Sequence, residues 1–115
     1  MWVTKLEEKG KRQVRVFLDE EKFCLLYLNE VKELGLRENQ ELRPEDFTKL
    51  QNVLLYRAKH KALSLLKTQD RTRKELKDRL LRAEFPEQTA EEAVIYAEYY
   101  GYIDDEEYVR RYMEY

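Results

Sequence analysis

The chain has 115 residues, of which 43% are hydrophobic and 40% charged, and its formal net charge is −2 with a pI near 5.6. This length suits one domain with a modest core, and no apolar run approaches the roughly 20 residues that cross a bilayer. The N-terminus lacks the basic-then-apolar plan of a signal peptide, so we expect a cytoplasmic protein without a membrane segment. One cysteine excludes an intrachain disulfide, and with one histidine it is too few for the usual structural zinc sites.

The first third of the chain contains three short apolar runs, at 3–8, 12–18 and 22–27. In the second run, Val14, Val16 and Leu18 alternate with other residues, which is the period of a strand with one buried face. Gly10 and the acidic residues 19–21 mark the two turns. The pattern predicts a three-stranded antiparallel meander as the main part of an N-terminal module, residues 1–43.

A short helix is predicted after the third strand. Asn29 is the expected N-cap, and Gly35 ends the helix because glycine adopts the left-handed conformation without steric cost. The connector that follows, 36–42, contains Asn39, which tolerates a positive φ.

A long helix is predicted from Pro44 to about Lys67. Proline suits a first helical turn, and Glu45 and Asp46 place negative charge where the helix dipole favours it. Apolar residues recur every three or four positions along this helix: Phe47, Leu50, Leu54, Ala58, Ala62 and Leu65.

A second helix is predicted to begin at Thr72. Thr72 and Glu75 form a capping box, in which each side chain satisfies the backbone N–H of the other residue. Leu76, Leu80 and Leu81 form its apolar stripe. Pro86 ends this helix and suits the first turn of the next one.

The next helix is predicted from about Glu87 to Tyr100 and is stopped by a left-handed Gly101. Its apolar face is made of small residues, which allow another helix to approach closely: Ala90, Ala93, Val94 and Ala97. Asp104 or Asp105 is expected to cap a further helix, with Tyr108 on its apolar face. The predicted fold is thus mainly α with a small N-terminal β-meander, a three-helix repeat unit over 44–103, and the first helix of a further repeat over 104–115.

The order and spacing of two motifs in the run 62–112 resemble the RecX family of bacterial regulatory proteins. The first motif is a capped helix start, which here contains Arg71, Thr72, Glu75 and Leu76. The second is a corner that reads G-Y-I-D-D-x-x-Y, which here contains Gly101, Tyr102, Ile103, Asp104, Asp105 and Tyr108. The resemblance implies stacked three-helix repeats, no enzyme activity, and a role in modulating the RecA recombinase.

Charge is unevenly distributed along the chain. Residues 1–50, 51–83 and 84–115 carry net charges of −1, +7 and −8. One interpretation is a solvated basic face balanced by the acidic helix behind it. The other is a surface that meets phosphates or an acidic protein groove, for which the candidate contacts are Arg57, Lys61, Lys67, Arg71, Arg73, Lys74, Lys77 and Arg82.

No catalytic constellation is visible in the sequence. His60 lies between two lysines and is expected to be an exposed helix residue, and Cys24 is expected to be a small core residue. Capping explains the acidic run at 104–107 better than a metal site does, so we expect no metal and no cofactor. Seven of the nine tyrosines follow Leu81, where packing is favoured over a binding face, and Tyr102 is expected to pack over the corner.

Two function classes follow. The family resemblance implies a regulator that docks on the RecA nucleoprotein filament and modulates strand exchange, ATP hydrolysis and coprotease activity, with a weak DNA contact at most. The alternative is a stand-alone nucleic-acid-binding module, with the meander as a wing beside a recognition helix at 72–84. A third interpretation is that the chain is a piece of a longer regulator and has no activity of its own. It is suggested by the last predicted helix, which reaches residue 115 without a C-cap. That uncapped helix is also a candidate surface for self-association.

Overall fold

The computed structural model describes residues 1–103, which fall into two compact units. The first unit ends at Val53 and the second begins at Leu54, so the division lies inside the long helix α2 (Pro44–Thr68). The expected cap at Asp104 or Asp105, the apolar face at Tyr108 and the self-association surface lie outside the described residues.

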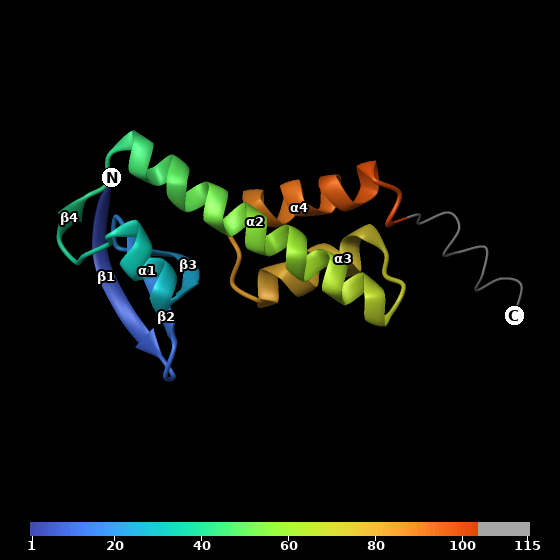
Figure 1. The fold of residues 1–115 in the computed structure, drawn as a ribbon, viewed down its shortest axis with the longest axis horizontal. Coiled ribbons are helices and arrows are strands. Elements are labelled where there is room, and N and C mark those ends of the chain that lie inside the picture. Colours follow the sequence, from blue (N-terminus) through green and yellow to red (C-terminus); the bar gives the residue numbers. More distant parts are fainter. Residues whose placement is uncertain (104–115) are drawn as a thin grey trace, which may run out of the picture. The chain divides into compact units, whose positions relative to one another are not determined.

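The first unit is built on an antiparallel sheet (Figure 1). Its strands are β1 (Trp2–Lys9), β2 (Gln13–Leu18), β3 (Glu21–Tyr27) and β4 (Gln40–Glu41), in the order β3-β2-β1-β4. The meander of the first three strands agrees with the sequence, but β4 was not predicted. It has only two residues, which pair with Trp2 and Val3, and so it is too short to show any alternation.

The alternation in β2 marks the buried face of the sheet, as predicted. Val14, Val16 and Leu18 are all buried. The turn into β3 consists of Asp19 and Glu20, which both have positive φ, at 49° and 70°. Non-glycine residues are uncommon in this conformation, and here the Asp19 carboxylate accepts a hydrogen bond from the backbone N–H of Trp2 at 2.8 Å. This bond ties the hairpin turn to β1.

Helix α1 (Leu28–Leu34) begins two positions earlier than predicted. Its N-cap is Tyr27, whose backbone N–H donates to Oε1 of Glu30 at 2.8 Å. Asn29 is therefore inside the first turn and not the cap, because the carboxylate of Glu30, three positions after the strand end, already satisfies the N–H of Tyr27.

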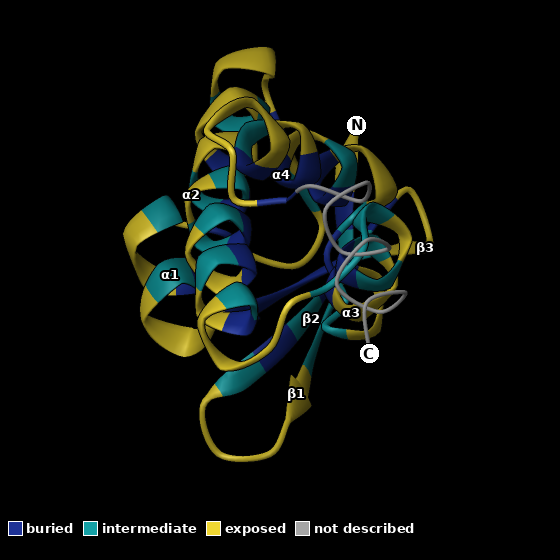
Figure 2. Ribbon diagram, turned by 90° about the vertical axis from the view of Figure 1, so that its right-hand side faces the viewer, coloured by how far each residue is buried: buried dark blue, intermediate teal, exposed yellow. Residues whose placement is uncertain are grey.

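The second unit packs the C-terminal part of α2 with α3 (Arg73–Arg82) and α4 (Glu87–Tyr99), and each helix has one buried and one exposed side (Figure 2). The small residues predicted for α4 are all fully buried. Leu76 and Leu80 of α3 are also fully buried, but Leu81 is 38% exposed, so the predicted stripe is narrower than expected. The core of this unit contains Ala58, Ala62, Leu65, Leu76, Leu80, Phe85, Ala90, Ala93, Val94, Ala97 and Ile103.

The same two-bond arrangement ends α1, α3 and α4. In each, a residue in the left-handed region donates its N–H three residues back, and the next residue donates five residues back, as in a Schellman motif. The left-handed residues are Gly35, Glu84 and Gly101, with φ of 67°, 66° and 76°. Gly35 and Gly101 were predicted as helix ends, whereas Glu84 adopts the same conformation with a side chain.

Two smaller expectations need correction. Pro86 is the N-cap of α4 and not a member of its first turn; its carbonyl accepts the N–H of Ala90 at 2.9 Å. Tyr102 does not cover the corner closely, since 54% of its surface is exposed. Among the described helices, none is long and apolar enough to cross a bilayer.

Candidate functional site: the basic surface of α3

The start of α3 is fixed by the predicted capping box. The Thr72 hydroxyl accepts from the N–H of Glu75 at 3.1 Å, and the Glu75 carboxylate accepts from the N–H of Thr72 at 3.4 Å. Arg71, the residue before the cap, donates from Nε to the carbonyl oxygen of Leu65 at 3.4 Å. These bonds fix where the basic helix begins relative to the end of α2.

Two of the candidate basic residues, Arg73 and Lys77, are held by the acidic helix α4. Arg73 pairs with Glu91 and, at 3.4 Å, with Glu98. Lys77 pairs with Glu91 at 3.0 Å and with Glu87 at 3.6 Å. The first interpretation of the charge pattern, a basic face balanced by the acidic helix, therefore describes these two residues.

The pKa values in this network follow from the ion pairs. Hydrogen bonds from Arg73 and then Lys77 lower the pKa of Glu91 to about 2. The hydrogen bond to Glu91 in turn raises the pKa of both Arg73 and Lys77. All three groups are therefore charged at neutral pH, and their function in the fold is to hold α3 against α4.

The opposite side of α3 carries basic residues that α4 does not hold. Lys74, Asp78, Leu81 and Arg82 follow one another at spacings of four, three and one, which places them on one side of a helix, and all are exposed. We call these four residues the α3 outer face. Within residues 1–103, no ion pair holds Lys74 or Arg82. Their side chains are available to a partner.

The candidate residues of α2 differ in their surroundings. Lys61 and Lys67 are exposed, whereas the Arg57 guanidinium lies 5.5 Å from the centroid of the Phe85 ring, in a cation–π arrangement. Of the eight predicted contacts, the structure thus leaves Lys61, Lys67, Lys74 and Arg82 most open to solvent, and it engages the other four within the second unit.

The tyrosines of α4 form a partly exposed cluster. The rings of Tyr96 and Tyr100 have centroids 4.9 Å apart, those of Tyr99 and Tyr100 5.0 Å, and Nζ of Lys59 lies 4.6 Å from the Tyr96 ring. Tyr99 is 81% exposed, so core packing does not explain this ring.

The residues considered for chemistry are placed as the sequence predicted. His60 is exposed and its ring centroid lies 4.4 Å from that of Tyr56, while Cys24 is fully buried in the first unit. The described part of the chain holds no cluster of histidine, cysteine and acidic residues suited to a metal ion.

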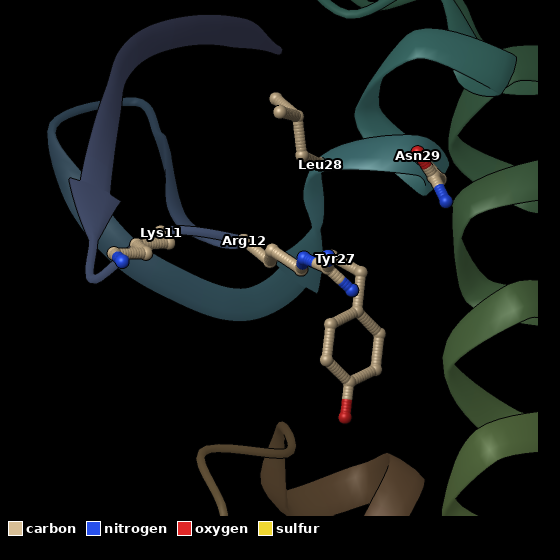
Figure 3. A pocket seen from close by; sticks show the side chains of 5 residues that line it. All are labelled: Lys11, Arg12, Tyr27, Leu28 and Asn29. Carbon is tan, nitrogen blue, oxygen red and sulfur yellow. The ribbon is translucent and has the colours of Figure 1, made fainter.

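One surface was missed by sequence analysis. Lys11, Arg12, Tyr27, Leu28 and Asn29 line a pocket of the first unit (Figure 3). The signal in the sequence was the basic run at 9–12, K-G-K-R, but only the pairing of β2 with β3 brings it beside Tyr27.

The fold is of the class in which a small antiparallel sheet precedes a three-helix domain. One particular family matches part of the chain: residues 58–96 match the family model for the first three-helix domain of RecX. The chain is related to this family, and the resemblance inferred from the two motifs is confirmed.

Two of its relatives are the regulatory proteins RecX of Clostridium beijerinckii and of Lactobacillus delbrueckii subsp. bulgaricus. The first is 29% identical over 111 residues, covering 94% of this chain and 52% of the relative. The second is 35% identical over 117 residues, covering 97% of this chain and 42% of the relative. The chain therefore spans about half the length of the relatives it matches.

A crystal structure of regulatory protein RecX is similar in fold. The TM-score is 0.57 at 19% identity, and the match covers 98% of this chain and 57% of that one. At this identity the likeness concerns the fold alone, and it extends over both units.

Proposed function

We propose that this chain acts as a regulatory binding protein that docks on the RecA nucleoprotein filament and modulates its activity without chemistry of its own. The proposal is supported by the family relationship and by one observation, the exposed basic residues of the α3 outer face. Its mechanism is electrostatic docking of a rigid helix on an acidic protein groove or on the DNA backbone within the filament.

The ion pairs behind α3 make this surface suitable for docking. Because Arg73 and Lys77 are bound to α4, the orientation of α3 is fixed from its inner side. Lys74 and Arg82 then project from a helix that does not need to be ordered on binding, which lowers the entropic cost of association. Leu81, which is exposed on the same face, adds apolar contact area.

Lys61 and Lys67 of α2 extend the proposed contact, because both are exposed and carry the same charge. Arg57 and Arg71 contribute in a different way. Arg57 lies over Phe85 and Arg71 binds the Leu65 carbonyl, so in this proposal they position the basic helix and touch the partner only with the remainder of their guanidinium groups.

The test is binding of this chain to RecA filaments on single-stranded DNA, compared with the same DNA without RecA, across a series of salt concentrations. We expect the chain to bind the filament and not the DNA alone. Lys74→Glu and Arg82→Glu should each weaken filament binding about tenfold, which corresponds to about 1.4 kcal/mol for the loss of a charge contact. Lys49→Glu is the matched control, because Lys49 is exposed and undergoes the same charge reversal outside the α3 outer face.

Two results would overturn the proposal. The first is equal binding to the DNA with and without RecA, if that binding is weakened by the same two charge reversals and falls steeply with salt. This result would favour the stand-alone nucleic-acid-binding module, with α3 as its recognition helix. The other is the absence of binding to filaments under all salt conditions.

A further inference from the structure

The pocket of the first unit combines two basic side chains with an exposed aromatic ring. Lys11 and Arg12 come from the turn between β1 and β2, and Tyr27 is the last residue of β3. Tyr27 is 46% exposed and Leu28 is 36% exposed, so both side chains present apolar surface to solvent at the junction of the sheet and the helix. Figure 3 shows the Tyr27 ring pointing away from its strand, with Arg12 reaching along the turn toward it.

Backbone hydrogen bonds hold the two sides of the pocket together. The N–H of Leu28 donates to the carbonyl oxygen of Arg12 at 2.8 Å, and Gln13 is the ladder partner of Tyr27. Tyr27 is further fixed by the hydrogen bond from its N–H to Glu30. The backbone positions that carry the cations and the ring are therefore fixed by the sheet itself, before any ligand binds.

The cations of this pocket are available for a ligand. Lys11 and Arg12 are exposed, and in the part of the chain that the structure describes neither is held by an ion pair. An ammonium and a guanidinium on consecutive residues of one turn suit phosphate oxygens, and an exposed phenol ring suits stacking of a flat base. Asn29, on the rim, supplies an amide that can both donate and accept hydrogen bonds.

We propose that this pocket binds single-stranded nucleic acid, with Lys11 and Arg12 on the phosphates and Tyr27 stacked on a base. An acidic peptide would use the two cations but offers no flat ring to Tyr27, so the combination favours a nucleotide strand. The tyrosines of α4 are less suited to a nucleotide strand, because the neighbouring cation Lys59 already lies 4.6 Å from the Tyr96 ring and the exposed Tyr99 follows the acidic Glu98. This inference does not rest on the RecA proposal, since it concerns the first unit and needs no filament.

The experiment measures binding of the chain, without RecA, to a short oligodeoxythymidine, to an abasic strand with the same number of phosphates, and to polyglutamate. We expect the oligodeoxythymidine to bind best and the abasic strand to bind more weakly. Tyr27→Ala should weaken oligodeoxythymidine binding by about 5- to 100-fold and leave the abasic strand unaffected, whereas Tyr27→Phe should retain the ring and the affinity.

The cations are tested by removing their charge. Lys11→Gln and Arg12→Gln should weaken both strands and each lower the slope of log affinity against log salt by about 0.7, the value for one released counterion on a single strand. Tyr99→Ala is the aromatic control and should change nothing, and circular dichroism of each variant checks the fold.

Three outcomes would overturn the inference. The first is that the unaltered protein binds the abasic strand and the base-bearing strand equally well. The second is that polyglutamate binds as well as or better than the oligodeoxythymidine. The third is that Lys74→Glu abolishes strand binding whereas Lys11→Gln does not. The last result would move nucleic-acid binding to the α3 outer face and would leave the RecA proposal to be decided by its own filament experiment.

Discussion

At the scale of single residues, Glu91 determines how the two charged helices are held together. It pairs with both Arg73 and Lys77, and these contacts lower its pKa from an ordinary 4.5 to about 2. A carboxylate whose pKa is lower in the folded state than in the unfolded state stabilises the fold above pH 4.5 and loses that contribution as the pH falls toward 2. Glu91 should therefore link the stability of the second unit to acid.

We predict that Glu91→Gln lowers the free energy of unfolding at pH 7 and that the difference from the unaltered protein shrinks between pH 4.5 and pH 2. Urea unfolding followed by circular dichroism at several pH values measures this. Glu92→Gln is the control, because Glu92 is the exposed neighbour of Glu91 and its substitution removes the same charge. A difference that stays constant down to pH 2 would show that the amide perturbs packing and not the ion pairs.

At the scale of elements, the correct predictions rest on local contacts, although the equally local N-cap of α1 was assigned to Asn29 and lies at Tyr27. The capping box of α3 spans four residues and the small face of α4 follows one helical period, and both were predicted correctly. The strand β4 and the pairing of Arg73 with Glu91 depend on contacts between distant positions, which no local pattern encodes. For the same reason, the candidate contacts could be selected from the sequence by charge, but their division into bound and exposed residues could not.

The end of α3 offers a prediction of its own. Glu84 adopts the left-handed conformation that Gly35 and Gly101 adopt at the other two helix ends, and a side chain there costs roughly 1–2 kcal/mol. Glycine loses more entropy on folding, which offsets part of the gain. Glu84→Gly should therefore raise the free energy of unfolding by about 0.5–1 kcal/mol in urea denaturation.

Glu84→Ala separates the backbone effect from loss of the carboxylate, because alanine keeps the Cβ atom and removes the charge. The glycine variant should be the more stable of the two. If alanine were equal to glycine, the conformation of residue 84 would carry no strain, and the two-bond helix end would tolerate any residue.

At the scale of the whole molecule, the described chain has two cores joined by one continuous helix. Val16, Cys24 and Leu26 are fully buried in the first unit, and Leu76 and Leu80 are fully buried in the second. Because α2 runs without a break across the division between Val53 and Leu54, the two units share a backbone element while burying separate sets of side chains. Separate cores favour separate opening reactions.

We predict that Leu80→Ala, which removes a buried side chain and costs about 2–5 kcal/mol, speeds amide hydrogen exchange in α3, α4 and the C-terminal part of α2. Amides of β1 to β3 should keep their protection, because the core of the second unit contains no residue of the sheet. Val16→Ala is the reciprocal variant and should loosen the sheet while α3 and α4 stay protected. If either variant lowered protection equally in both units, the chain would unfold as one cooperative body, and α2 would transmit the loss of either core to the other.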